Sequence, residues 1–285
     1  MTVINTNVNA TFAQAALTTN ARAQTSAMQD LSTGKRINSA KDDAAGLAMS
    51  ETMTGQIRGL NMAIRNANDG ISLLQTAEGA MIEQTNMLQR MRELAVQASS
   101  DTVDNDAKGY LDTEFSALKN EINRIGANTQ WNGKALLDGS FTGSAVTAGV
   151  YSFQVGANAS DAKVSITISN MQTSGTGAAL TGINSSSIGT AGAASAALGA
   201  ITSALSTIAL QRSKIGATMN QLTYAADNLT NVSQNTTDSR SRILDTDYAT
   251  ATTALSRTQI ISQAATAMLA QANQQQQSVL SLLKG

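Results

Sequence analysis

An apolar stripe with the period of an α-helix extends over most of the residues between Ser39 and Ser99. Its members are Ile57, Leu60, Ile64, Ala67, Ile71, Leu74, Ala77, Met81, Ile82, Leu88 and Met91. The stripe shifts at Glu78, as a seven-residue repeat must on a straight helix of 3.6 residues per turn. A helix of about 60 residues is roughly 90 Å long, whereas a compact globule of this chain length is about 50 Å across. We therefore predict a mainly α, elongated fold.

Two local signals bound this helix and the next one. Ser39 and Asp42 have the spacing of a capping box, which predicts a helix start there. A second apolar stripe predicts another helix that stops at Gly126; it consists of Leu111, Phe115, Leu118, Ile122 and Ile125. Asn132-Gly133 then predicts a turn, beside which Trp131, the single tryptophan, is expected to be a packing anchor.

The middle of the chain changes character. Apolar and polar residues alternate in two short segments, with the apolar positions at Tyr151, Phe153 and Val155 and at Val164, Ile166 and Ile168. This alternation predicts a β-hairpin within about residues 141–170. Residues 171–195 are rich in Ser, Thr and Gly and are predicted to form a surface loop, which could also carry O-linked sugars.

Apolar heptads resume beyond this loop. They comprise Leu198, Ile201, Leu205, Ile208, Ile215, Met219, Leu222, Ala226 and Leu229, and Arg212 occupies the one stripe position with a charge. Sustained heptads are typical of helices packed on helices. The long stripes together predict a long antiparallel helical hairpin or coiled-coil rod with one small β-hairpin region.

Composition argues against several functions. The chain has no Cys, His or Pro, so it lacks thiol and imidazole groups for nucleophilic catalysis and for ordinary zinc or copper sites. We expect no enzyme, cofactor or metal. The net charge of −1 lacks the basic surplus of a nucleic-acid binder, and we expect neither a membrane span nor a cleavable signal peptide.

The two ends of the chain share an unusual composition. Residues 1–21 and 258–283 contain no charged side chain and carry a sparse apolar stripe among Ala, Thr, Asn and Gln. The stripe comprises Ile4, Val8 and Phe12 at one end and Ile261, Met268, Leu269, Val279, Leu280 and Leu283 at the other. Such helices alone bury too little apolar surface to offset their chain entropy. We expect them to become stable against each other and against copies of the chain.

Several motifs resemble those of bacterial flagellins. In the N-terminal half they are residues 3–7 (VINTN), 31–45 (LSTGKRINSAKDDAA), 65–71 (RNANDGI) and 88–97 (LQRMRELAVQ). Near the C-terminus they are residues 239–249 (SRSRILDTDYA) and 256–273 (SRTQIISQAATAMLAQAN). The resemblance covers roughly residues 1–138 and 195–285, and residues 151–159 (YSFQVGANA) are similar to the family's hairpin.

The resemblance implies a domain layout. Residues 1–45 with 238–285 would form an inner terminal-helix domain and a connecting spoke. Residues 46–237 would form a rod-like helical domain that includes the hairpin at about 141–170 and the loop at about 171–195. Few residues remain for the outer domains that most flagellins carry, so these are expected to be absent.

The resemblance also implies a function. The chain would polymerise into the extracellular filament of the bacterial flagellum for motility, after export in an unfolded state through the flagellar type III apparatus. The implied partners are copies of itself, an export chaperone, the filament cap and hook-junction proteins, and the Toll-like flagellin receptor of animal hosts. By position in the motif, the receptor would contact Gln89, Arg90, Glu93, Leu94, Gln97 and Glu114. The alternative for Arg90 and Glu93 is an ordinary ion pair within one helix or an assembly contact.

Other interpretations stay open. A flagellar hook–filament junction protein would share the terminal helices, and a nonpolymerising secreted coiled-coil protein would show the same heptads. An enzyme would need a polar cluster in a pocket, for which the sequence offers no candidate. A pore-forming translocator would need a long apolar segment.

Overall fold

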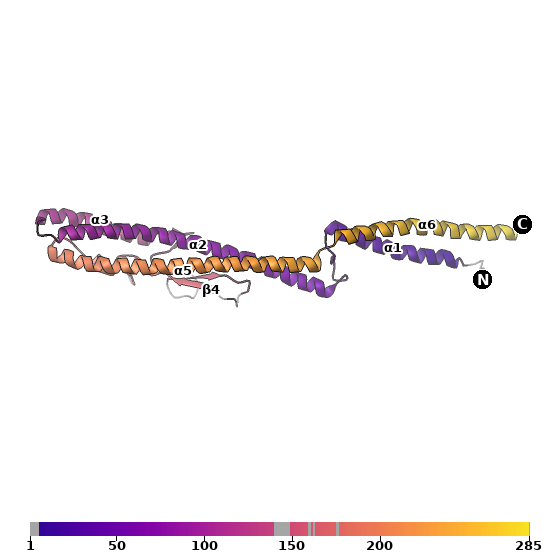
Figure 1. Ribbon diagram of the computed structural model, residues 1–285, viewed down its shortest axis with the longest axis horizontal. Coiled ribbons are helices and arrows are strands. Elements are labelled where there is room, and N and C mark those ends of the chain that lie inside the picture. Colours follow the sequence, from indigo (N-terminus) through magenta and orange to yellow (C-terminus); the bar gives the residue numbers. More distant parts are fainter. Residues whose placement is uncertain (1–5, 140–148, 159–160, 162, 175–176, 285) are drawn as a thin grey trace. The chain divides into compact units, whose positions relative to one another are not determined.

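The computed structural model describes residues 6–139, 149–158, 161, 163–174 and 177–284 (Figure 1). Its elements, in chain order, are α1 (Val8–Thr33), α2 (Ala44–Ala98), α3 (Asn105–Asn128), β1 (Gln130–Trp131), β2 (Lys134–Ala135), β3 (Val150–Gln154), β4 (Lys163–Thr167), α4 (Thr181–Asn184), α5 (Ala191–Leu244) and α6 (Tyr248–Lys284). The chain divides into a terminal unit, residues 1–55 and 234–285, and a central unit, residues 56–233. The boundaries fall inside α2 and α5.

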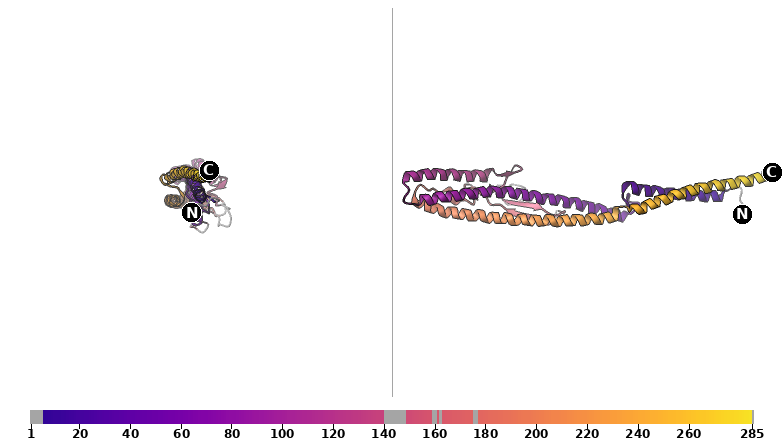
Figure 2. Two further views of the ribbon diagram at one scale, coloured as in Figure 1. Left: turned by 90° about the vertical axis from the view of Figure 1, so that its right-hand side faces the viewer. Right: turned by 45° about the horizontal axis from the view of Figure 1, so that its top comes forward.

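In the central unit, α2, α3 and α5 lie side by side (Figures 1 and 2). Contacts between α2 and α3 join Gln84 to Ile122 and Arg90 to Glu114, so the two helices run in opposite directions. Contacts between α2 and α5 join Asn61 to Ser233 and Glu78 to Arg212, so these two helices also run in opposite directions. The predicted mainly α fold with a long antiparallel helical hairpin is confirmed.

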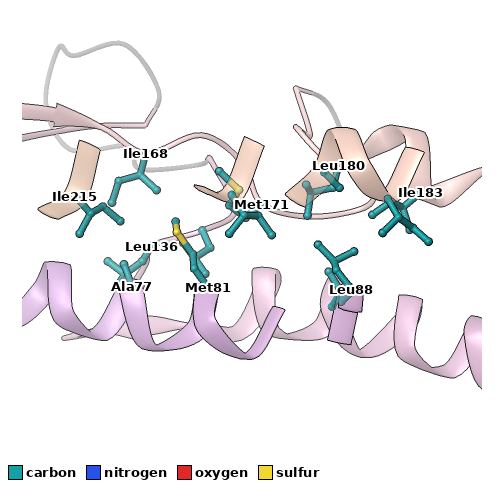
Figure 3. Close-up of a cluster of buried hydrophobic side chains, with 14 of the residues drawn as sticks. Ala77, Met81, Leu88, Leu136, Ile168, Met171, Leu180, Ile183 and Ile215 are labelled. Carbon is teal, nitrogen blue, oxygen red and sulfur yellow. The ribbon is translucent and has the colours of Figure 1, made fainter. Parts of the chain in front are cut away.

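The core of the central unit lies between α2, α5 and the segments that connect them. Figure 3 shows Ala77, Met81 and Leu88 of α2 facing apolar side chains of these other parts, which are Leu136, Ile168, Met171, Leu180, Ile183 and Ile215. The prediction of a surface loop at residues 171–195 is therefore wrong. Leu180, Ile183 and Ile188 are at most 1% exposed, α4 lies within the segment, and α5 already begins at Ala191.

The buried stripe of α5 differs in part from the predicted one. It consists of Ala194, Ala197, Ile201, Ala204, Ile208, Gln211, Ile215, Thr218, Leu222 and Ala226. Leu198, Leu205 and Met219 flank this stripe and are only partly buried. The alanines of the buried stripe have small side chains, and these allow the helices to approach closely. Arg212 and Glu78, which are the charges at the two interrupted stripe positions, face each other at 3.4 Å between Nη2 and Oε1.

Two predicted helix ends are also corrected. The Asp42 carboxylate accepts hydrogen bonds from the Ser39 backbone N–H at 2.9 Å and hydroxyl at 3.0 Å, which closes a turn before α2. The helix starts later, where Asp43 accepts from the Gly46 N–H at 2.9 Å. Helix α3 continues past Gly126 to Asn128. Gly126 instead permits a close approach, because a Cβ there would lie 3.0 Å from the Met171 carbonyl oxygen.

The two predicted β features are present. Asn132 and Gly133 both have positive φ angles, 49° and 75°, and form the turn between β1 and β2. Strands β3 and β4 pair antiparallel with Tyr151 opposite Ile166. The Tyr151 hydroxyl donates to the Ala135 carbonyl at 2.8 Å. Burial raises the pKa of this phenol to about 12, with a contribution from the Asp138 charge.

Among the described residues, one helix, α5, is long and apolar enough to span a membrane. Its isoleucines at 201, 208 and 215 are buried in the core of the central unit. Part of its apolar surface is therefore packed inside the protein.

Two glycines of α2 should respond in opposite ways to substitution by alanine. A Cβ at Gly79 meets no atom within 4 Å, whereas a Cβ at Gly70 would lie 2.8 Å from the Phe153 ring. We expect Gly79→Ala to raise the free energy of unfolding by about 0.5–1 kcal/mol through helix propensity. Gly70→Ala should lower it by about 1–2 kcal/mol through overpacking. Urea unfolding followed by circular dichroism measures both, and equal stabilisation by both changes would contradict the described packing of β3 on α2.

The start of α6 should be sensitive to acid. The Asp247 carboxylate accepts hydrogen bonds from the Thr250 hydroxyl at 2.6 Å and the Ala249 N–H at 3.0 Å, and these bonds lower its pKa below the usual 3.8. A carboxyl group with a lowered pKa stabilises the fold above its ordinary pKa, and this contribution is lost as the pH falls through the lowered value. We therefore expect faster amide exchange at residues 249–252 below pH 3.8. Asp247→Asn should weaken this cap already at neutral pH. Asp227→Asn on α5 is the control and should leave the acid response of these amides unchanged.

Candidate assembly surface

Helices α1 and α6 lie side by side in the terminal unit and run in opposite directions (Figure 1). Asn7 donates from Nδ2 to the Ala272 carbonyl at 3.3 Å, and Asn20 donates from Nδ2 to the Thr258 carbonyl at 2.7 Å. The Tyr248 hydroxyl donates to the Leu31 carbonyl at 3.3 Å. The pair is therefore joined largely by polar side chains on helix carbonyls rather than by a deep apolar core.

The apolar contacts between α1 and α6 bury correspondingly little surface. Among the described residues of α1 and α6, those that are buried are Asn20, Ala27 and Ala251, each still 8–9% exposed. A small amide and two methyl groups remove little apolar surface from water, and the stabilisation from apolar burial scales with the area removed. Most of the larger apolar side chains of the two helices remain outside the contact.

These outer side chains form what we call the terminal apolar surface, which comprises Val8, Phe12, Ile260, Ile261 and Met268. They are 58%, 77%, 66%, 40% and 66% exposed, respectively. Four of the five were predicted from the sequence, whereas Ile260 was not. Leu269, also predicted, is partly buried. Ile4 lies outside the described residues, as do the side chains of Val279, Leu280 and Leu283.

A groove of about 660 Å³ lies along the boundary between α1 and α6. Phe12, Ala16 and Asn20 line it from α1, and Thr258 and Ile261 line it from α6. Its one charged lining residue is Arg257. Two members of the terminal apolar surface, Phe12 and Ile261, thus line a mostly apolar groove, and exposed apolar surfaces of this kind mark interaction sites.

The residues assigned to receptor binding occupy a different surface, on α2 and α3 of the central unit. The Arg90 guanidinium contacts Glu114 Oε1 at 2.9 Å and Glu93 Oε2 at 3.0 Å. The hydrogen bond to Glu114, followed by that to Glu93, raises the pKa of Arg90. Gln89 and Gln97 are exposed beside this cluster. Leu94 is 1% exposed and belongs to the core, so its side chain does not reach the surface that the other five share.

A second groove, of about 590 Å³, adjoins this cluster. Its lining includes Arg92, Val96 and Leu205 in addition to Gln89, Glu93 and Gln97. The motif comparison did not indicate Val96, although its side chain is 54% exposed. The signal that could have indicated Val96 is its position on the face of α2 opposite the buried stripe. In the described part of the chain, no group of acidic side chains is suited to hold a metal ion.

Comparison of the chain with known proteins identifies its family. The model of the bacterial flagellin N-terminal helical region matches residues 4–142, and that of the bacterial flagellin C-terminal helical region matches residues 198–283. A flagellin of Halalkalibacterium halodurans is 43% identical over 282 residues, which cover 99% of this chain and 100% of that protein. A flagellin of Bacillus subtilis is 42% identical over 303 residues and 99% of both chains.

A protein of Vibrio parahaemolyticus that is described as flagellar hook-associated has a related structure. The TM-score is 0.58 at 14% identity, with 72% of this chain and 100% of that chain covered. At this identity the likeness shows the fold alone. Both helical-region models and the relatives matched over their full length agree, and the chain therefore belongs to the bacterial flagellins.

Proposed function

We propose that the chain is the structural subunit of a flagellar filament and polymerises through the terminal apolar surface. The main support is the exposure of apolar side chains: Phe12, Ile260 and Met268 are each at least 66% exposed. The segments that carry them, residues 1–21 and 258–283, contain no charged side chain. A large exposed apolar surface marks an interaction site. Membership of the flagellins makes other copies of the chain the fitting partner.

The geometry also suits an open polymer rather than a closed dimer. Met268 does not line the groove between α1 and α6, whereas Phe12 and Ile261 do, so a copy could insert Met268 into the groove of its neighbour. Contacts between unlike surfaces propagate into helical assemblies when the rotation does not close a ring. Burial of the exposed apolar area would contribute about 25 cal/mol per Å². Electron microscopy of salted-out protein tests this proposal, and amorphous precipitate in place of tubes would contradict it.

Phe12→Ser should abolish polymerisation and leave the central unit intact. The ring is 77% exposed in the subunit, so its loss removes interface area and little internal packing. Sedimentation after salting out, with electron microscopy of the pellet, measures the effect. Tyr110→Ser on α3 is the matched control because that ring is 78% exposed and lies outside the terminal apolar surface. If both changes reduce polymer equally, the terminal helices are not the main contact.

The route to the filament is part of the same proposal. The subunit is exported unfolded through the flagellar type III apparatus and is held beforehand by an export chaperone. It is added at the filament tip beneath the cap, and hook-junction proteins join the filament base to the hook. The filament is extracellular. Family membership supports these steps, and the thin contact between α1 and α6 suits a chain that must unfold and refold.

We further infer that the Toll-like flagellin receptor of animal hosts binds the surface around Arg90. Arg90, Glu93 and Glu114 form a cluster of hydrogen-bonded charges with Gln89 and Gln97 beside it. An arginine offers several donors in one plane and is favoured at binding hot spots. The buried Leu94 would act by supporting the helix beneath this surface.

Arg90→Ala should reduce receptor activation at least tenfold, which corresponds to about 1.4 kcal/mol, with little change in the thermal midpoint. The small stability effect is expected because exposed ion pairs stabilise weakly. A reporter-cell assay with purified subunit gives the first quantity, and thermal unfolding gives the second. Arg124→Ala is the control because Arg124 pairs with Glu121 at the same spacing and is 59% exposed. Equal loss of activation in both variants would contradict a specific contact at Arg90.

A further inference from the structure

Helices α5 and α6 are separated by only three residues, Asp245 to Asp247. No glycine or proline occurs between Gly216 and Gly285, although helices commonly end at a glycine or before a proline. Asp247 caps the start of α6 through the Ala249 N–H, but no comparable signal in the sequence ends α5. The interruption at Leu244 therefore needs a cause elsewhere in the terminal unit.

That cause is visible in the hydrogen bonds of the interruption. In a continuous α-helix the Thr246 N–H would bond to the carbonyl four residues earlier, and the Ile243 and Leu244 carbonyls would accept from N–H groups four residues later. Instead, Thr246 N–H donates to the Gly34 carbonyl at 3.0 Å. Arg36 donates from its backbone N–H to Leu244 at 2.7 Å and from Nη2 to Ile243 at 2.8 Å.

Residues 34–36, which we call the strap, thus form hydrogen bonds with three backbone groups, namely one N–H and two carbonyls. In a helix continuous from α5 to α6, these groups would bond within the helix itself. Lys35 also pairs with Asp245 in an antiparallel β-bridge. The exchange is one hydrogen bond for another, and such exchanges have small net free energies. A broken helix and a continuous helix are therefore close in energy, and the strap can decide between them.

Its own neighbours hold the strap in place. Gly34 has a left-handed φ of 69° and ends α1 by donating to the Asp30 carbonyl, so the chain leaves the helix at a defined angle. Ile37, directly after the strap, is 3% exposed. It lies against Gly46 of α2, where an added Cβ would be 2.6 Å from the Ile37 side chain. The strap is thus held by α1 on one side and by α2 on the other, in addition to its hydrogen bonds with the interruption.

We propose that the strap imposes the interruption between α5 and α6, with Arg36 as the positioning residue that holds the α1–α6 pair in the arrangement needed for polymerisation. The assembly part of this inference rests on the proposed function. When the strap is released, α5 and α6 become continuous through Asp245–Asp247, and α6 no longer keeps its contacts with α1.

Three substitutions separate this role from a general loss of structure. Arg36→Met removes the guanidinium donor only. Arg36→Pro removes both donors, and the extended conformation of Lys35 in the β-bridge is the one that a residue before proline prefers. Lys41→Met is the control, because it removes a cation from the same connecting segment but not from the strap.

A fourth change should restore the interruption without the strap. Tyr248→Pro places proline at the first residue of α6, where it is tolerated, and blocks a continuous helix. We expect wild type and Lys41→Met to polymerise, Arg36→Met to yield less sedimentable polymer, and Arg36→Pro to lose most of it. The double variant Arg36→Pro/Tyr248→Pro should regain the yield of Tyr248→Pro alone, which keeps the strap but lacks the Tyr248 hydroxyl bond to the Leu31 carbonyl. Fluorescence of Trp131 during thermal unfolding should be the same in all variants, because the central unit is unchanged.

Backbone carbon chemical shifts at residues 245–247 give a second readout that does not depend on polymer. They should move toward helical values in Arg36→Pro and return in the double variant. Unchanged shifts in Arg36→Pro, or wild-type polymer yield from it, would overturn the inference. A wild-type chain that forms no filaments would overturn the proposed function instead, and the chemical shifts would still test the strap.

Discussion

Close packing of α2 against the buried stripe of α5 is the constraint on which the central unit depends. Isoleucines at 201, 208 and 215 alternate with smaller residues along this stripe, so large and small side chains can interdigitate at the density of a protein interior. The β3–β4 hairpin, α4 and the segment around Met171 pack against the same core. Each of these elements is too small to fold alone, and each owes its order to the surface that the long helices present.

Polar groups inside that core decide where the irregular segments lie. Gln84 is fully buried and donates from Nε2 to the Ile122 and Met171 carbonyls, each at 3.1 Å. Gln211 is also buried and donates to the Thr167 carbonyl at 2.9 Å. Buried backbone carbonyls need partners, and segments outside regular helices lack neighbours of their own to supply them. These two amides therefore fix the register of the connecting segments on the helices.

Periodicity predicted the long helices and both hairpin features well, because these depend on spacing along a single element. It failed where a residue's partner lies elsewhere in the chain. Gln211 belongs to the buried stripe only because β4 brings a carbonyl to it. The segment at 171–195 is composed like a loop, yet its apolar residues, among them Leu180, Ile183 and Ile188, meet a core that its own composition does not reveal. At the candidate surface, Phe12 and Met268 were predicted because absence of charge is a local property. The burial of Leu94, by contrast, depends on the phase of a whole stripe.

The charge-free ends have a consequence for the surroundings in which the filament can exist. Salt weakens contacts between exposed charges by screening them, but an interface without side-chain charges offers it little to screen. Salts that are excluded from protein surfaces, such as sulfate, strengthen apolar burial instead. In the proposed filament, contacts made by residues 1–21 and 258–283 should therefore persist at low and at high salt concentration alike, so the filament would stay assembled as its cell moves between fresh and saline water.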